Sequence, residues 1–193
     1  MGAPRAPEPG SKAEAEAGRE LNSPGFGVSF ISTSREYLCS EYPAKIDRAL
    51  EGLDEADVWW RPTPVCNSIG HLLRHLSGNV RQWILHGIGG AADSRDRASE
   101  FDERPDSMRV VRAELRGTLE ASDRVLAGLS EGALAEPVTI QGLETTVGEA
   151  LYHVVEHFSM HTGQVLWIAK ARSGRDLGLY EVDERGDVIG THW

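Results

Sequence analysis

The chain has 193 residues, of which 26% are charged and 40% are hydrophobic, and its formal net charge at pH 7 is −10. This length fits one domain with a sizeable core, or a domain plus a tail. The acidic balance argues against a broad nucleic-acid surface, which needs clustered Lys and Arg. No apolar run approaches the roughly 20 residues needed to cross a bilayer, so no membrane partner is expected.

The cysteine content and the N-terminal residues indicate the cellular compartment in which the protein is expected. Cys39 and Cys66 are too few for a disulfide framework, and neither has a metal-type spacing beside it, so ordinary packing is favoured over a ligand or nucleophile role. The first 20 residues lack the apolar segment of a secretory signal. We therefore expect a protein of the reducing cytoplasm.

The N-terminal half contains a tail and the first predicted helix. Residues 1–24 are mostly Ala, Glu, Pro and Gly, and they bury too little surface to offset their ordering entropy, so a disordered tail is expected. From Phe26 to about Leu53 the apolar spacing predicts a helix, which Pro43 is expected to kink or divide. The two prolines within residues 54–66 predict a turn and linker.

The second and third predicted helices are joined by a long connection. Residues 67–90 form the second helix, with Asn67 as a suitable N-cap and a Gly-Gly pair at its end. Residues 91–107 are strongly charged and predict a long crossover. Residues 108–129 form the third helix.

The fourth predicted helix begins at Thr146 and ends at about Ala171. Thr146 and Glu149 have the spacing of a capping box, in which each side chain binds the other residue's backbone N–H. The connection before it, residues 133–146, contains β-prone residues that suit a small hairpin. Residues 176–193 show no helical period, and an irregular or strand-like tail is expected there.

Together these elements predict an all-α fold. Four helices with a long link between the second and the third describe a four-helix bundle with a crossover connection. The bundle occupies residues 25–175, with the disordered tail before it and the irregular C-terminal tail after it.

Three of the seven histidines lie on the fourth helix at four-residue intervals, namely His153, His157 and His161. The apolar seam of this helix includes Val154 and Val165, and its steps of three and four turn His157 and His161 inward as well. Two inward histidines one turn apart can reach one ion. His153 and His161 are separated by roughly 12 Å of rise, so one ion is not easily reached from both. A single metal site therefore needs a third ligand from another helix.

The second helix offers two histidines for this role. Periodicity favours His75 over His71, because His75 lies nearer the apolar face, but it does not place His75 at the centre of that face. Other bundle chemistries are excluded by motif: no Glu is followed by a His three residues later, as in di-iron carboxylate bundles, and the zinc-protease motif H-E-x-x-H is absent.

Three stretches carry a family resemblance. "NSIGHLLRHLSGN", "RASEF" and "HVVEHFSMHTGQVLWIA", taken in order, resemble the DinB-like metal-binding four-helix bundles, in the branch with N-S-I, H-L-x-G-N and H-x-x-x-H-x-G-Q motifs. The resemblance covers about residues 27–175. It implies an up-down-down-up bundle in which His75, His157 and His161 bind one divalent ion, with Zn or Ni as the expected metal.

The resemblance also implies a class of activity. Characterised relatives include metal-dependent transferases of low-molecular-weight thiols and a thiol-dependent isomerase, so a thiol transferase acting on a small-molecule substrate is expected, with no nucleic-acid partner and with a homodimer left open. The alternatives are a hydrolase or isomerase that uses metal-activated water, and a non-catalytic, stress-related metal-binding bundle. Asn79 and Gln164 are candidates to support the ligands, and Arg97 is a candidate anchor for a substrate carboxylate, with a surface ion pair as its alternative.

Overall fold

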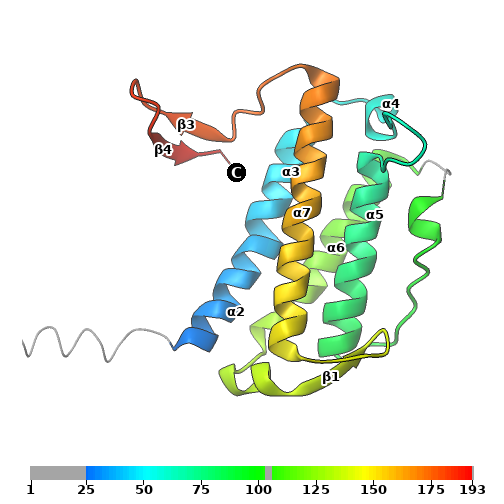
Figure 1. The fold of residues 1–193 in the computed structure, drawn as a ribbon, viewed down its shortest axis with the longest axis vertical. Coiled ribbons are helices and arrows are strands. Elements are labelled where there is room, and N and C mark those ends of the chain that lie inside the picture. Colours follow the sequence, from blue (N-terminus) through cyan, green and yellow to red (C-terminus); the bar gives the residue numbers. More distant parts are fainter. Residues whose placement is uncertain (1–24, 103–105, 193) are drawn as a thin grey trace, which may run out of the picture.

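The computed structural model describes residues 25–102 and 106–192, and the predicted N-terminal tail lies outside these residues. Within the described part, four long helical segments pack side by side along one axis (Figure 1). The second and third segments run in one direction, and the first and fourth run in the other. The predicted all-α bundle, with its up-down-down-up order and long crossover, is confirmed.

The first segment is one continuous rod built from α2 (Phe26–Glu36), a π-helical turn η1 (Tyr37–Glu41) and α3 (Tyr42–Leu50). Pro43 does not divide it. Because Pro43 has no N–H to donate to the carbonyl of Cys39, the helical hydrogen-bond spacing changes just before the proline, and the π-helical turn accommodates this change.

A short helix, α4 (Glu55–Val58), lies in the predicted linker, and the second segment follows as α5 (Ile69–Val80) and the π-helical η2 (Arg81–Ile88). The helix ends at the predicted place, with Gly89 as its C-cap and Gly90 at a φ of 72°. A positive φ of this kind favours glycine, because a Cβ would strain the backbone.

The start of α5 differs from the prediction by one residue, since the N-cap is Ser68 and not Asn67. Ser68 Oγ accepts a hydrogen bond from the His71 N–H at 3.2 Å, and the Ser68 N–H donates to His71 Nδ1 at 3.4 Å. This reciprocal pair is a capping box with a histidine in the place of the usual Glu or Gln, which the sequence pattern did not indicate.

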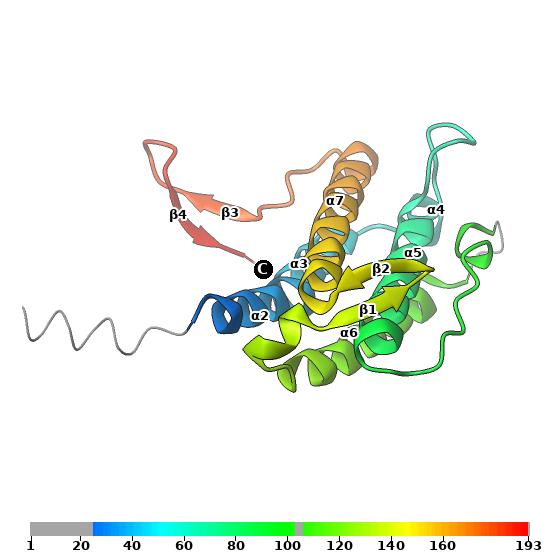
Figure 2. The same ribbon diagram turned by 60° about the horizontal axis from the view of Figure 1, so that its bottom comes forward.

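The crossover carries a short 3-10 helix, η3 (Ser99–Phe101), and the third segment is α6 (Met108–Ala127). A second 3-10 turn, η4 (Glu131–Ala135), leads into an antiparallel hairpin of β1 (Pro137–Ile140) and β2 (Leu143–Thr146). Figure 2 shows this hairpin lying across the end of the bundle where the fourth segment begins.

The fourth segment is the single helix α7 (Val147–Ser173), which ends at Gly174 with a left-handed φ of 64°. The sequence left two alternatives for the C-terminal segment, an irregular or a strand-like tail, and the described residues up to 192 form the strand-like one. Leu177 and Leu179 are buried in the core, and a hairpin of β3 (Tyr180–Val182) and β4 (Val188–Thr191) follows them.

The helices enclose one apolar core. Its largest fully buried side chain is Phe158 of α7, whose ring stacks on Tyr42 of α3 with centroids 5.7 Å apart. None of the helices among the described residues is both long enough and apolar enough to cross a membrane. Other core residues come from all four segments, including Leu38, Ile46, Leu72, Leu76, Leu119, Leu126, Val154 and Ile168.

Candidate metal centre

The register of α7 is set at its first turn. Glu149 Oε2 accepts a hydrogen bond from the Thr146 N–H at 3.0 Å, and the Glu149 N–H donates to Thr146 Oγ1 at 3.2 Å, so the predicted capping box is confirmed. From this start, steps of three and four residues bring the apolar seam inward together with two histidines. His161 is 8% exposed, and His157 is half-buried beside it.

The third histidine comes from α5. His75 is 7% exposed and lies between Leu72 and Leu76, which are 1% and 0% exposed. Both neighbours are anchored in the apolar core, so the backbone that carries His75 is fixed by packing. The tertiary structure therefore buries His75, as the apolar periodicity of α5 had weakly indicated.

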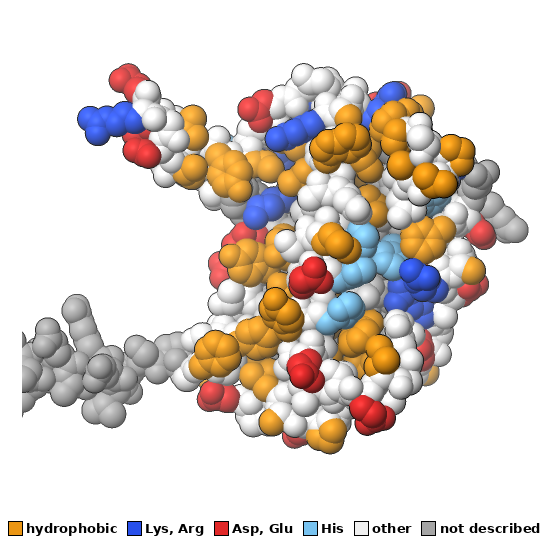
Figure 3. All heavy atoms as spheres, in the orientation of Figure 1, with side chains coloured by type: hydrophobic (Ala, Val, Ile, Leu, Met, Phe, Trp, Pro, Cys, Tyr) orange, Lys and Arg blue, Asp and Glu red, His pale blue; other side chains and the backbone are white. Residues whose placement is uncertain are grey.

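The three histidines meet between α5 and α7. Their ligand atoms all lie within 4.8 Å of one another, and the Nε2 atoms of His75 and His157 are 3.0 Å apart. The ring centroids of His157 and His161 are 4.4 Å apart. Figure 3 shows histidine side chains gathered on one face of the molecule, next to a patch of Lys or Arg.

In two of these imidazoles, the Nδ1 atom points away from the site where the three rings converge and contacts a side-chain oxygen. Glu100 Oε2 lies 2.8 Å from His75 Nδ1, and Gln164 Oε1 lies 2.7 Å from His161 Nδ1. An oxygen that accepts from Nδ1–H leaves the Nε2 lone pair free to bind an ion. The donor set therefore fits one divalent ion held by three neutral imidazoles, a set that both zinc and nickel accept.

A family model described as "Protein of unknown function (DUF1572)" matches residues 25–182, which include the whole bundle and all three histidines. The chain belongs to this DinB-like family. No protein among those with curated descriptions matches the chain.

Two solved structures share the fold. A DinB-like protein from Bacillus cereus ATCC 10987 superposes with a TM-score of 0.59 at 16% identity, over 76% of this chain and 93% of that chain. A conserved protein from Enterococcus faecalis superposes with a TM-score of 0.60 at 14% identity, over 75% of this chain and 97% of that chain. At these identities the likeness establishes the DinB-like fold.

Burial favours the neutral form of two of the histidines of this DUF1572 protein, His157 and His161. Desolvation, followed by the neighbouring His161 and His75, lowers the pKa of His157 from 6.5 to about 3. Desolvation also lowers the pKa of His161, although its hydrogen bond to Gln164 opposes the shift. Neutral imidazole is the form that binds metal, so the fold prepares these side chains for an ion.

A pH dependence of stability follows for the metal-free protein. The pKa of His157 is lower in the folded chain than in the unfolded chain, so the unfolded chain binds more protons below pH 6.5. The stabilising effect of the neutral imidazole is complete above pH 6.5 and is lost as the pH falls toward 3. In urea unfolding at pH 7.0, 6.0 and 5.0, we expect a declining free energy of unfolding and a smaller decline for His157→Gln. Equal slopes in the two proteins would contradict this.

The two remaining histidines near the centre have other contacts. His153 stacks against Trp83, with centroids 4.2 Å apart, and lies 5.5 Å from His157, so it flanks the cluster. His71 belongs to the capping box of α5 and packs against Trp59 with centroids 5.5 Å apart. Neither is among the three converging histidines that could hold an ion.

Three further residues were predicted from the sequence to support the site, namely Gln164, Asn79 and Arg97. Gln164 contacts His161 directly, as described above. Asn79, one turn after His75 on α5, is 4% exposed, and its Oδ1 has no hydrogen-bond partner among the described residues. Arg97 is exposed and lies over the Phe101 ring at 5.7 Å, and that ring lies 5.2 Å from His75. Among the described residues Arg97 forms no ion pair, so the alternative role proposed from the sequence is not seen there.

Two residues beside the cluster, Arg95 and Glu100, were not among the candidates predicted from the sequence. Both lie in the segment that was predicted as a strongly charged crossover, and their side chains are only 5% and 7% exposed. Glu100 forms part of the "RASEF" stretch that contributed to the family resemblance. That motif was the available signal, but no helical periodicity marks a crossover residue as buried.

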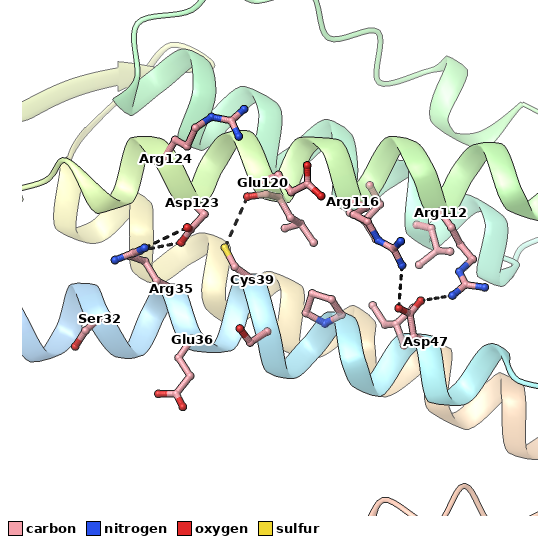
Figure 4. Close-up of a pocket in the computed structure, with 16 residues that line it drawn as sticks. Ser32, Arg35, Glu36, Cys39, Asp47, Arg112, Arg116, Glu120, Asp123 and Arg124 are labelled. Carbon is pink, nitrogen blue, oxygen red and sulfur yellow. Dashed lines mark hydrogen bonds and ion pairs between the residues drawn. The ribbon is translucent and has the colours of Figure 1, made fainter. Parts of the chain in front are cut away.

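A separate groove of about 810 Å³ lies on another part of the bundle, between the first segment and α6 (Figure 4). Ion pairs of Arg35 with Asp123 and of Arg112 with Asp47 cross it. Cys39 lies in this groove, with its Sγ 3.8 Å from the carbonyl oxygen of Leu119. Burial and the nearby Asp123 raise the pKa of the Cys39 thiol to about 12, which suits a packing role.

Cys39 is therefore expected to react slowly with alkylating agents. Because the thiolate is the reactive form, iodoacetamide at pH 8 should modify Cys39 at least ~100-fold more slowly in the native protein than in urea. Peptide mapping by mass spectrometry at timed intervals measures the two rates separately from that of Cys66. Comparable native and unfolded rates at Cys39 would show that its thiol is activated.

Proposed function

We propose that this protein binds one divalent metal ion through His75, His157 and His161, and that it uses the ion to transfer a low-molecular-weight thiol. The convergence of the three ligand atoms within 4.8 Å carries the proposal. The hydrogen bonds at Nδ1 of His75 and His161 support it, because they orient the Nε2 lone pairs toward a common point.

The metal ion would activate the thiol, and residues of the chain would hold the ion and orient its ligands. A divalent ion held by His75, His157 and His161 would lower the pKa of a thiol bound to it and would thereby supply a nucleophile at neutral pH. The chain itself favours the neutral form of His157 and His161 by burial, and it orients the rings of His75 and His161 through Glu100 and Gln164. It need not supply a nucleophile, which agrees with the inert environment of Cys39.

The surroundings of the cluster suit a small molecule. A groove of about 460 Å³ borders the site through Gln164 and is lined by Leu72, Met160 and Trp167, so it offers an apolar surface to part of a substrate. Arg97 lies beyond Phe101 on the crossover, and we propose that its guanidinium binds a substrate carboxylate. Replacing Arg97 with Met is then expected to raise KM more than it lowers kcat.

Cobalt substitution tests the thiol proposal. The protein is loaded with Co(II), and its absorption spectrum is recorded while cysteine, glutathione and other biological thiols are added in turn. A sulfur-to-cobalt charge-transfer band is expected with at least one thiol, and it should be absent from a His157→Ala, His161→Ala double variant. A thiol-dependent transferase screen with zinc- and nickel-loaded protein follows.

The outcomes separate the alternatives. A cobalt spectrum that ignores every thiol would overturn thiol transfer. Thiol-independent turnover of an ester, amide or isomerisable substrate would then indicate a hydrolase or isomerase. Bound metal without any turnover would indicate a non-catalytic metal-binding bundle.

A further inference from the structure

The crossover places two buried charges against the metal centre. The side chains of Arg95 and Glu100 are 5% and 7% exposed, although both residues belong to a connection between helices. A buried charge is costly unless it is paired and hydrogen-bonded. The contacts of these two side chains therefore indicate what the crossover does.

The Glu100 carboxylate receives donors at both oxygens. Arg95 Nε donates to Oε1 at 2.7 Å, and Arg95 Nη2 donates to Oε2 at 3.0 Å, which is the bidentate geometry of a strong charge-assisted pair. Oε2 also lies 2.8 Å from His75 Nδ1. Burial opposes ionisation of Glu100, but the hydrogen bonds from His75 and Arg95 outweigh it and hold the pKa of this carboxyl below its usual value.

We propose that Glu100 is a positioning residue that holds His75 in the Nδ1–H tautomer and thereby presents its Nε2 to the metal, while Arg95 holds the Glu100 carboxylate in place. The inference rests on the proposed metal site. Glu100 is not among the converging ligand atoms, so its effect on the ion passes through His75. Nothing in the sequence periodicity or in the matched family description assigns it this role.

One contact could favour the opposite tautomer. Arg95 Nη2 lies 3.3 Å from His75 Nδ1, and a guanidinium can only donate, so this contact would need an unprotonated Nδ1. That arrangement would direct the Nδ1 lone pair at the Glu100 oxygen 2.8 Å away, which is repulsive. The shorter contact to a carboxylate decides in favour of Nδ1–H.

Arg95 is itself fixed by a polar network. Its Nη1 donates to Gln82 Oε1 at 2.9 Å, and its backbone N–H donates to Asp93 Oδ1 at 3.0 Å. Gln82 Nε2 donates to the other oxygen of Asp93 at 2.8 Å. These hydrogen bonds connect the start of the crossover to Gln82 of η2. Through Arg95 they also hold Glu100 against α5.

Gly78 makes room for the carboxylate. A Cβ at this position would lie 2.0 Å from Glu100 Oε1 and 2.8 Å from Glu100 Cδ. Gly78 lies three residues after His75, on a neighbouring part of the same helical face. The same Cβ would lie 3.1 Å from Arg95 Nε, so a methyl group at residue 78 would displace the carboxylate and disturb the Arg95–Glu100 pair that holds it beside His75. The glycine of the "HLSGN" stretch thus has a specific steric role.

Histidine NMR tests the tautomer directly. Nitrogen shifts of 15N-labelled, metal-free wild-type protein at pH 7.5 report which ring nitrogen of His75 carries the proton, and Nδ1–H is expected. In Glu100→Gln, the amide should direct its oxygen at Arg95 and its NH2 at His75, which reverses the tautomer to Nε2–H. A wild-type His75 in the Nε2–H form would overturn the inference.

Metal affinity provides a second readout. Zinc competition with a chromophoric chelator should show a loss of about 10–100-fold for Glu100→Gln and for Gly78→Ala, the range known for outer partners of metal-bound histidines. Asp123→Asn is the matched control, because it breaks a bidentate Arg–carboxylate pair elsewhere in the bundle and should leave zinc affinity unchanged. Unchanged affinity in both test variants would overturn the inference.

Failure of the metal site and failure of the Glu100 role give different results in these experiments. If the wild-type protein binds no metal, the metal site itself is wrong. If the wild-type binds zinc tightly and His75 is the Nδ1–H tautomer in both wild-type and Glu100→Gln, then only the role of Glu100 is wrong. Should Glu100→Gln fail to fold, the wild-type spectrum and Gly78→Ala still decide the question.

Discussion

Replacing His161 with alanine will remove the bound metal. The variant loses one of the three proposed ligands and also leaves the side chain of Gln164 without its hydrogen-bond partner at Nδ1. The loss of affinity should exceed the roughly 10–100-fold effect of an outer partner, because a direct ligand is gone. Elemental analysis of the purified protein and competition with a chelator measure it.

Two histidines serve as matched controls for this experiment. His153→Ala removes an imidazole from the same helix that stacks on Trp83, and His71→Ala removes one from α5 that caps the helix. Both variants should keep one ion per chain, and His71→Ala should lose some stability through the damaged cap. Full metal occupancy in His161→Ala, or loss of metal in His153→Ala, would contradict the ligand set.

Replacing Phe158 with alanine will cause the largest loss of stability expected from a single apolar residue. Phe158 is 0% exposed, stacks on Tyr42 and lies next to His157 on α7. A Phe→Ala change in a core removes buried surface and leaves a cavity, at a cost of about 3–5 kcal/mol. Urea unfolding of the metal-free protein measures the change in the free energy of unfolding.

Exposed aromatic residues on the same helix give the control. Tyr152 and Trp167 are 63% and 61% exposed, so truncating either one to alanine should change the free energy of unfolding by no more than about 0.5 kcal/mol. Metal affinity provides a further comparison, because the cavity at residue 158 should also loosen the backbone that carries His157. A loss below about 1 kcal/mol for Phe158→Ala would show that the core is not packed as described.

The bundle itself could be predicted because its signals are local. Helical periodicity, the capping box at Thr146 and the Gly-Gly pair after Ile88 each mark an element without reference to the rest of the chain. The start of α5 was placed one residue early because a histidine at residue 71 completes its capping box. For the segment that forms the hairpin over residues 180–191, the sequence left a strand-like and an irregular structure as alternatives. Short exposed strands have only a weak hydrophobic pattern, so the sequence did not decide between them.

The sequence by itself determined the all-α class, the order of the four helices, and the inward positions of His157 and His161, because these follow from spacing within one helix. Only the tertiary structure decided that the Nε2 atoms of His75 and His157 come within 3.0 Å of each other. It also decided that Glu100 and Arg95 are buried beside them. The physical reason is that a crossover has no period that marks its buried side chains, so the position of Glu100 depends on packing against Gly78 and on the charge of Arg95.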